Sequence, residues 1–131
     1  MRNFLSNNPN SKAFTSLGRL RYLSCLKHVD GIIGNSSNCL LEVPTCKIGT
    51  IYIGDRQSGR IKARSVIDCE PNEPSISSAI KKLYSVDFQN KLTTVKNPYG
   101  CGGASESIVN ILNEISLDSL LKKKFYNLNQ E

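Results

Sequence analysis

The chain has 131 residues, a length that suits one compact domain with a core of ordinary size. Hydrophobic residues make up 39% and charged residues 21% of the chain, and no apolar stretch approaches the ~20 residues that a membrane span requires. The first residues lack the long apolar segment of a secretory signal, so we expect a cytoplasmic protein without membrane contact.

The net charge of +6 raises the question of a nucleic-acid ligand. Only Lys122-Lys123-Lys124 forms a contiguous basic run, and neither interleaved aromatic residues nor a nucleic-acid-binding motif accompanies it. We therefore expect no nucleic acid partner. An anionic small ligand and ordinary surface charge explain five arginines better, namely Arg19, Arg21, Arg56, Arg60 and Arg64.

Five cysteines are scattered along the chain without the paired spacing of a zinc site. Their odd number does not fit a disulfide framework. They are Cys25, Cys39, Cys46, Cys69 and Cys101. We expect reduced core or loop residues and no metal.

The first half of the chain predicts a lead-in, a helix, a strand and a second helix. Residues 1–15 are expected to form a partial or irregular lead-in. Apolar residues at helical spacing predict an amphipathic helix over 18–29, and the continuous apolar run over 29–34 predicts a short buried strand. A helix that begins near Ser36 must end by Pro44, because proline interrupts helical hydrogen bonding.

The second half predicts two more strands and three helices. The strands are expected over 49–54, bracketed by glycines, and over 65–69. Ser75 is predicted to cap a helix with apolar positions at Ile76, Ala79, Ile80 and Leu83. The same spacing follows Gly102-Gly103, at Ile108, Ile111, Leu112 and Ile115, and a C-terminal helix is expected over 117–131.

Alternation of short strands with helices predicts the fold class. Such an order is typical of a parallel sheet with right-handed crossovers. We therefore expect an α/β fold with a Rossmann-like, doubly wound parallel sheet, in a single domain over 1–131.

Two polar segments follow the first two predicted strands. Gly34-Asn35-Ser36-Ser37 precedes a helix start, where backbone N–H groups without internal partners and the helix dipole favour a phosphate. Gly54-Asp55-Arg56 follows the second strand. Ligands of parallel sheets bind beyond the carboxyl ends of the strands, so both segments are expected to face one crevice. With the carboxylate of Glu42, they suggest a nucleotide-sugar site.

Three blocks, in order and spacing, resemble the UDP-N-acetylglucosamine 2-epimerases, and the hydrolysing branch in particular. The first runs from Ser16-Leu17-Gly18 through Gly34-Asn35-Ser36-Ser37 to Glu42-Val43-Pro44. The second is Ile53-Gly54-Asp55-Arg56-Gln57-Ser58-Gly59-Arg60, and the third is Asn97-Pro98-Tyr99-Gly100-Cys101-Gly102-Gly103-Ala104. The family has two doubly wound domains of GT-B type with the active site between them. This chain resembles the second, nucleotide-binding domain only.

The resemblance implies a UDP-binding role for this domain, with UDP or UDP-N-acetylglucosamine as ligand. Ser36 and Ser37 would bind the diphosphate, and Arg56 would neutralise phosphate charge. Glu42 would accept hydrogen bonds from the ribose hydroxyls. The backbone of Leu17 would meet the uracil edge while Tyr22 packs on the base.

Further candidates and absences follow from the same resemblance. Asn35, Gln57 and Arg60 are additional candidates for ligand contact. The acid and base carboxylates are expected on the first domain, so no catalytic residue is expected in this chain, and neither a metal nor a cofactor is implied. Two departures from the family pattern are Asn38-Cys39, where the family has a glycine, and Cys101, where it has an acidic residue.

Simpler roles remain open for several of these residues. Ser36 and Ser37 would also suit a helix cap, and Glu42 a solvated helix position. Arg56 has Asp55 as a neighbour for a surface ion pair. For Gln57 and Arg60, both ligand contact and support of their loop remain open. For Tyr22, both base contact and core packing remain open.

The function that follows is the UDP-binding half of a hydrolysing UDP-N-acetylglucosamine 2-epimerase. In the family, UDP leaves by anti elimination, and water adds to give N-acetylmannosamine, a precursor of sialic-acid-like sugars. The isolated chain is expected to be inactive. Because an isolated half exposes apolar surface that normally faces the other domain, we expect a separate N-terminal-domain chain as partner, self-association or poor solubility. The alternatives are a non-catalytic or vestigial nucleotide-sugar-binding fragment and, third, the nucleotide half of a GT-B glycosyltransferase.

Overall fold

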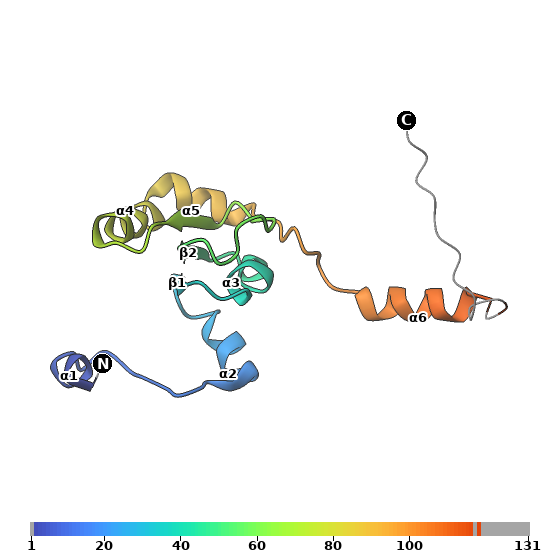
Figure 1. Cartoon of the computed structure of the whole chain (residues 1–131), viewed down its shortest axis with the longest axis horizontal. Helices are drawn as coiled ribbons and strands as arrows, with labels where there is room; N and C mark the ends of the chain where they lie inside the picture. Colours follow the sequence, from blue (N-terminus) through green and yellow to red (C-terminus); the bar gives the residue numbers. More distant parts are fainter. Residues whose placement is uncertain (1, 117, 119–131) are drawn as a thin grey trace. The chain divides into compact units, whose positions relative to one another are not determined.

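The computed structural model describes residues 2–116 and 118 (Figure 1). The chain divides into two compact units, residues 1–100 and residues 101–131. The predicted C-terminal helix over 117–131 lies outside the described residues, apart from Asp118. The single domain over 1–131 stays a prediction.

Three parallel strands form the centre of the first unit, in the order β1-β2-β3. They are β1 (Gly31–Gly34), β2 (Gly49–Ile53) and β3 (Val66–Cys69). Gly34 pairs with Tyr52, and Ile53 pairs with Cys69. All three predicted strands are confirmed, and their carboxyl ends share one edge of the sheet.

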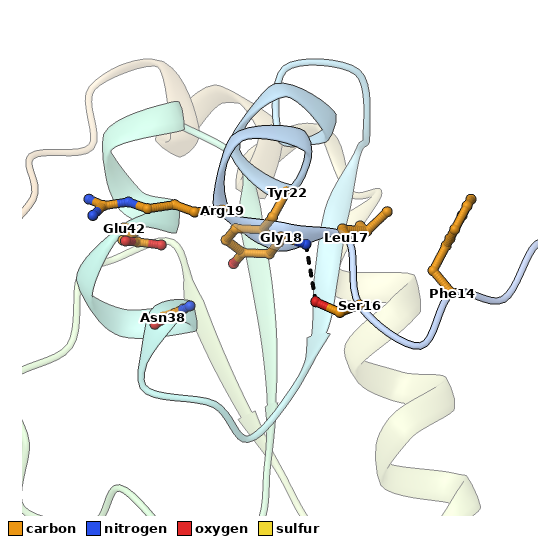
Figure 2. A pocket seen from close by; sticks show the side chains of 8 residues that line it. All are labelled: Phe14, Ser16, Leu17, Gly18, Arg19, Tyr22, Asn38 and Glu42. Carbon is orange, nitrogen blue, oxygen red and sulfur yellow. Dashed lines mark hydrogen bonds between the residues drawn. The ribbon is translucent and has the colours of Figure 1, made fainter.

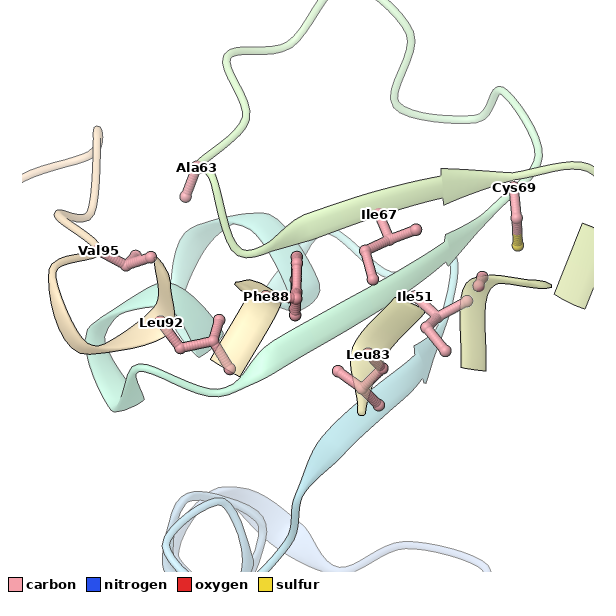
Figure 3. Close-up of a cluster of buried hydrophobic side chains, with 9 residues drawn as sticks. Ile51, Ala63, Ile67, Cys69, Leu83, Phe88, Leu92 and Val95 are labelled. Carbon is pink, nitrogen blue, oxygen red and sulfur yellow. The ribbon is translucent and has the colours of Figure 1, made fainter. Parts of the chain in front are cut away.

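Helices cover both faces of this sheet. Successive side chains of a strand point to opposite faces, so neighbouring residues of β2 pack against different helices. On one face, Ile51 of β2 belongs to a buried cluster with residues of α4 (Glu73–Leu83) and α5 (Val86–Thr93) (Figure 3). On the other, Tyr52 packs with Cys39 and Leu40 of α3 (Asn38–Leu41). The Rossmann-like α/β fold class is therefore confirmed.

Two paired glycines let the end of α4 lie close to the sheet. Gly31 of β1 is in register with Gly49 of β2. A Cβ atom on Gly49 would overlap Cδ1 of Leu83, and one on Gly31 would lie 2.9 Å from Cδ2 of the same side chain. The absent side chains thus make room for Leu83, which is 4% exposed.

The helix predicted over 18–29 is shorter than expected. The structure has α2 at Gly18–Cys25, and none of its residues is buried. Leu26, just beyond its end, is fully buried, and turns follow it, with the N–H of His28 donating to the carbonyl of Cys25 at 2.9 Å. The burial of Leu26 and these turns end the helix before the strand.

The helix expected after Ser36 is also short. It begins at Asn38, comprises a single turn, and continues as a 3₁₀ turn, η1 (Val43–Cys46). Pro44 lies in the first turn of η1, where its missing N–H has no helical partner to lose. The α-helix therefore ends before Pro44, as predicted, but it offers only a small dipole.

The structure corrects the predicted cap of α4, and it shows a further helix, α5, after α4. Asn72, not Ser75, is the cap, because its side-chain oxygen accepts a hydrogen bond from the N–H of Ser75 at 2.9 Å. The Ser75 hydroxyl instead accepts from the N–H of Glu70 at 3.0 Å. Sequence analysis did not predict α5, which Ser85 caps by accepting from the N–H of Phe88.

Two further helices lie at the ends of the described chain. A short helix, α1 (Arg2–Asn7), occupies part of the expected lead-in. In the second unit, α6 (Ala104–Glu114) confirms the helix predicted after Gly102-Gly103. None of the helices within residues 2–116 has the length and apolar character needed to cross a bilayer.

Candidate functional site

The two polar segments lie at the same edge of the sheet. Asn35 follows β1 directly, and its carbonyl accepts a hydrogen bond from the Tyr52 hydroxyl of β2 at 3.4 Å. Gly54 follows β2, and its N–H donates to the carbonyl of Cys69 at 2.9 Å. These bonds tie both segments to the neighbouring strand at the carboxyl edge.

A cavity of about 670 Å³ lies between α2 and α3 (Figure 2). Three of its lining residues, Leu17, Tyr22 and Glu42, are among those predicted to bind UDP. The remaining lining residues are Phe14, Ser16, Gly18, Arg19 and Asn38. The structure therefore gathers the predicted base-binding and ribose-binding residues around one space.

Tyr22 lies in the middle of this cavity in Figure 2 and is partly buried. Burial raises the pKa of its hydroxyl, and the nearby Cys39 and Glu42 raise it further. The phenol is therefore neutral, and a hydrogen-bond donor, at physiological pH. Its ring is accessible from the cavity and packs only partly into the protein, so both predicted roles are compatible with its position.

Glu42 follows α3 directly and is partly exposed. Its N–H donates to the carbonyl of Asn38 at 3.0 Å, which fixes its backbone at the end of the helical turn. Within the described residues, its carboxylate takes part in no hydrogen bond or ion pair. Two oxygens are thus free to accept hydrogen bonds from a ligand's hydroxyl groups.

Ser36 and Ser37 lie next to the cavity but do not line it. The Ser36 hydroxyl accepts a long hydrogen bond from the N–H of Asn38 at 3.4 Å, which supports the capping role only weakly. The N–H of Ser37 has no acceptor in residues 2–116, whereas the backbone of Ser36 interacts with the Cys39 thiol. The N–H of Ser37 and the two hydroxyls, rather than the dipole of a long helix, are the donors available to an anion.

The loop after β2 holds the other predicted residues. Arg56 and Arg60 are exposed, and within the described part of the chain no ion pair joins Arg56 to Asp55. Arg56 does not line the cavity. Gln57 is 6% exposed, and its carbonyl accepts from the N–H of Arg60 at 3.2 Å, which favours loop support over ligand contact for this residue.

Five residues that line the cavity were not among the predicted nucleotide contacts, and one of them, Gly18, has no side chain. Phe14 and Ser16 lie in an irregular segment that has no periodicity to point them out, although the Ser16 hydroxyl accepts from the N–H of Gly18 at 3.1 Å. Asn38 was noted only as a departure from the family pattern. Arg19 was attributed, with four other arginines, to an anionic ligand and surface charge. A more specific signal is its spacing, because it precedes Tyr22 by three residues and helical spacing places the two on one face.

The thiols and carboxylates give no sign of a metal site. No group of three or more His, Cys, Asp or Glu side chains within the described residues has the arrangement to hold a metal ion. All five cysteines are free thiols. Burial raises the pKa of Cys39 and of Cys69, so both stay protonated at neutral pH.

Comparison with known proteins gives consistent results. The sequence model of a family described as UDP-N-acetylglucosamine 2-epimerase matches residues 1–113. The chain is 38% identical, over 123 residues, to a GDP/UDP-N,N'-diacetylbacillosamine 2-epimerase (hydrolyzing) of Campylobacter jejuni, a match that covers 93% of this chain and 32% of the relative.

Two more relatives also match most of this chain over a small part of their own length. The polysialic acid biosynthesis protein P7 of Escherichia coli is 37% identical over 82% of this chain and 28% of the relative. A UDP-N,N'-diacetylbacillosamine 2-epimerase (hydrolyzing) of Legionella pneumophila is 26% identical over 88% of this chain and 30% of the relative. The chain thus spans roughly a third of the length of the curated relatives it matches.

Proposed function

The chain belongs to the UDP-N-acetylglucosamine 2-epimerase family, and from this premise we propose that it is a UDP-binding part of a hydrolysing sugar-nucleotide 2-epimerase. The cavity lined by Leu17, Tyr22 and Glu42 is the observation that supports it most directly. It offers a backbone edge, an aromatic face and a free carboxylate within one space. Those are the groups that a base and a ribose diol require.

The nucleotide would lie along this cavity and reach the carboxyl edge of the sheet. The uracil would meet the backbone of Leu17 and the ring of Tyr22, and the ribose hydroxyls would donate to Glu42. The diphosphate would then extend toward the hydroxyls of Ser36 and Ser37 and the N–H of Ser37, which has no acceptor within the described residues. Arg56, exposed on the loop after the neighbouring strand, would approach the diphosphate from that side, with Asn35 and Arg60 as further candidates.

This part would contribute electrostatic stabilisation rather than proton transfer. Elimination of UDP from the sugar places growing negative charge on the departing diphosphate. Backbone N–H groups and a guanidinium fixed at that position stabilise the charge as it develops. The carboxylates that act on the sugar would come from a first domain, supplied by a separate chain. Self-association is the alternative way in which the apolar surface of this part would be covered. The cytoplasmic location stays a prediction from the sequence.

A non-catalytic nucleotide-sugar-binding domain is the second candidate. Asn38-Cys39 replaces a glycine of the family pattern, and Asn38 lines the cavity, where its side chain would crowd a phosphate. The match to the epimerase family disfavours the third alternative, a glycosyltransferase half.

Calorimetric titration of the full chain with UDP tests the proposal. We expect binding of UDP, with weaker binding of 2′-deoxyuridine diphosphate because one hydrogen bond to Glu42 is lost. In Glu42→Gln, the affinity for UDP should fall by about tenfold, since bonds to charged acceptors contribute about 1.5–3 kcal/mol. The difference between the two nucleotides should also shrink in this variant.

Glu73→Gln is the matched control, because Glu73 is exposed in the first turn of α4, within the same unit, and does not line the cavity. It should leave both affinities unchanged. If the chain shows no heat of binding with UDP at millimolar concentration, the proposed function is wrong. If UDP binds but Glu42→Gln has no effect, the ribose lies elsewhere.

A further inference from the structure

Arg19 is the one basic side chain among the residues that line the cavity. We infer that Arg19 binds the phosphate groups of the nucleotide, as a second guanidinium in addition to Arg56. This inference rests on the proposed function, because it assumes that a nucleoside diphosphate occupies the cavity. Nothing in the resemblance assigned Arg19 to the ligand.

The position of Arg19 on α2 directs it to the ligand. It precedes Tyr22 by three residues, and residues three apart share one face of a helix. Figure 2 shows the Arg19 side chain extending to the side of Tyr22 on which Glu42 and Asn38 lie, away from Phe14. The guanidinium is thus at the polar end of the cavity, beyond the position expected for the base.

The charges of the cavity favour a cation near the expected diphosphate. Glu42 is the other charged residue in the lining, and its carboxylate repels a diphosphate nearby. A guanidinium at the same end offsets that repulsion, and it also presents planar donors that match phosphate oxygens. Within the described residues, the Arg19 side chain makes no hydrogen bond or ion pair, so its donors are available.

Arg21 provides the internal comparison. Both arginines are exposed and lie on the same helix, but Arg21 is not part of the cavity lining. At about 100° per residue, two positions along a helix point to nearly opposite sides. An effect of general positive charge on α2 would be shared by both residues, whereas a contact with the ligand belongs to Arg19 alone.

The test compares Arg19→Gln with Arg21→Gln in titrations of the full chain with UDP, UMP and uridine. For Arg19→Gln we expect about a tenfold loss of affinity for UDP, a smaller loss for UMP and almost none for uridine. Arg21→Gln should change each affinity by less than about twofold. Arg19→Lys should restore part of the UDP affinity, because it keeps the charge but not the fork of donors.

Four outcomes overturn the inference. Equal losses for uridine and UDP in Arg19→Gln would show that the residue contacts the base or ribose or supports the fold. Equal effects of Arg19→Gln and Arg21→Gln would reduce its role to general charge. A wild-type chain that binds UDP while Arg19→Gln binds it equally well rejects the inference alone, whereas a wild-type chain that binds no nucleotide rejects the proposed function as well.

Discussion

Helices α4 and α6 have the same apolar spacing and opposite environments. In α4, Ala79 and Leu83 are each 4% exposed and pack in the core cluster on one face of the sheet. In α6, Ile111 and Leu112 are 61% and 64% exposed. Hydrophobic periodicity therefore predicts that a segment is helical and which side is apolar, but it does not predict what that side contacts.

The largest effect should separate the two helices directly. Leu83→Ala should lower the free energy of unfolding by about 2–5 kcal/mol, because it leaves a cavity between α4 and the sheet. Leu112→Ala, the matched change on α6, should stay within about 0.5 kcal/mol. Urea unfolding followed by circular dichroism measures both. A loss for Leu112→Ala as large as that for Leu83→Ala would mean that the apolar side of α6 is covered in solution.

The second effect tests why α4 lies so close to the sheet. Gly49→Ala should cost about 1–3 kcal/mol, because the new methyl group overlaps Leu83. Gly34→Ala is the control, since a Cβ atom there meets nothing within 4 Å. The cost of Gly49→Ala should be smaller when Leu83→Ala is also present, a non-additivity that unfolding of the double variant measures. Equal costs for Gly49→Ala and Gly34→Ala would contradict the close approach.

The smallest effect concerns how the two helices begin. Asn72 caps α4 with its side chain, whereas the N-cap residue of α6, Gly103, offers no side-chain cap. Asn72→Ala should cost about 1 kcal/mol, as loss of a cap usually does. Asn90→Ala, at an exposed position inside α5, should be neutral in the same thermal unfolding experiment. A neutral Asn72→Ala would indicate that the packing of α4 alone fixes its start.

Local signals in the sequence were sufficient for the strands and for the helices with regular apolar spacing. They failed where tertiary structure decided the outcome. The burial of Leu26 ends α2 early. In α5, the buried apolar positions Phe88 and Leu92 do not belong to a longer periodic pattern, so the sequence did not reveal this helix. Ser75 has the chemistry of a cap, but Asn72 comes first and already occupies the N–H of Ser75.

The candidate site shows the same division. The resemblance pointed to Leu17, Tyr22 and Glu42, and the structure brings these three around one cavity. No property of the sequence related Phe14 to that cavity, because an irregular segment has no period from which its direction follows. Arg56 stays a prediction, since it lies at the same sheet edge but outside the cavity lining.

The paired glycines of β1 and β2 have a consequence for how this family can vary. Gly31 and Gly49 face the same leucine from adjacent strands, so a larger residue at either position displaces Leu83. A drift toward alanine or serine in one strand is therefore tolerable only after the helix residue has become smaller. Relatives that have lost one of these glycines should accordingly have alanine or valine in place of the leucine, a correlated substitution that a comparison of many sequences will reveal.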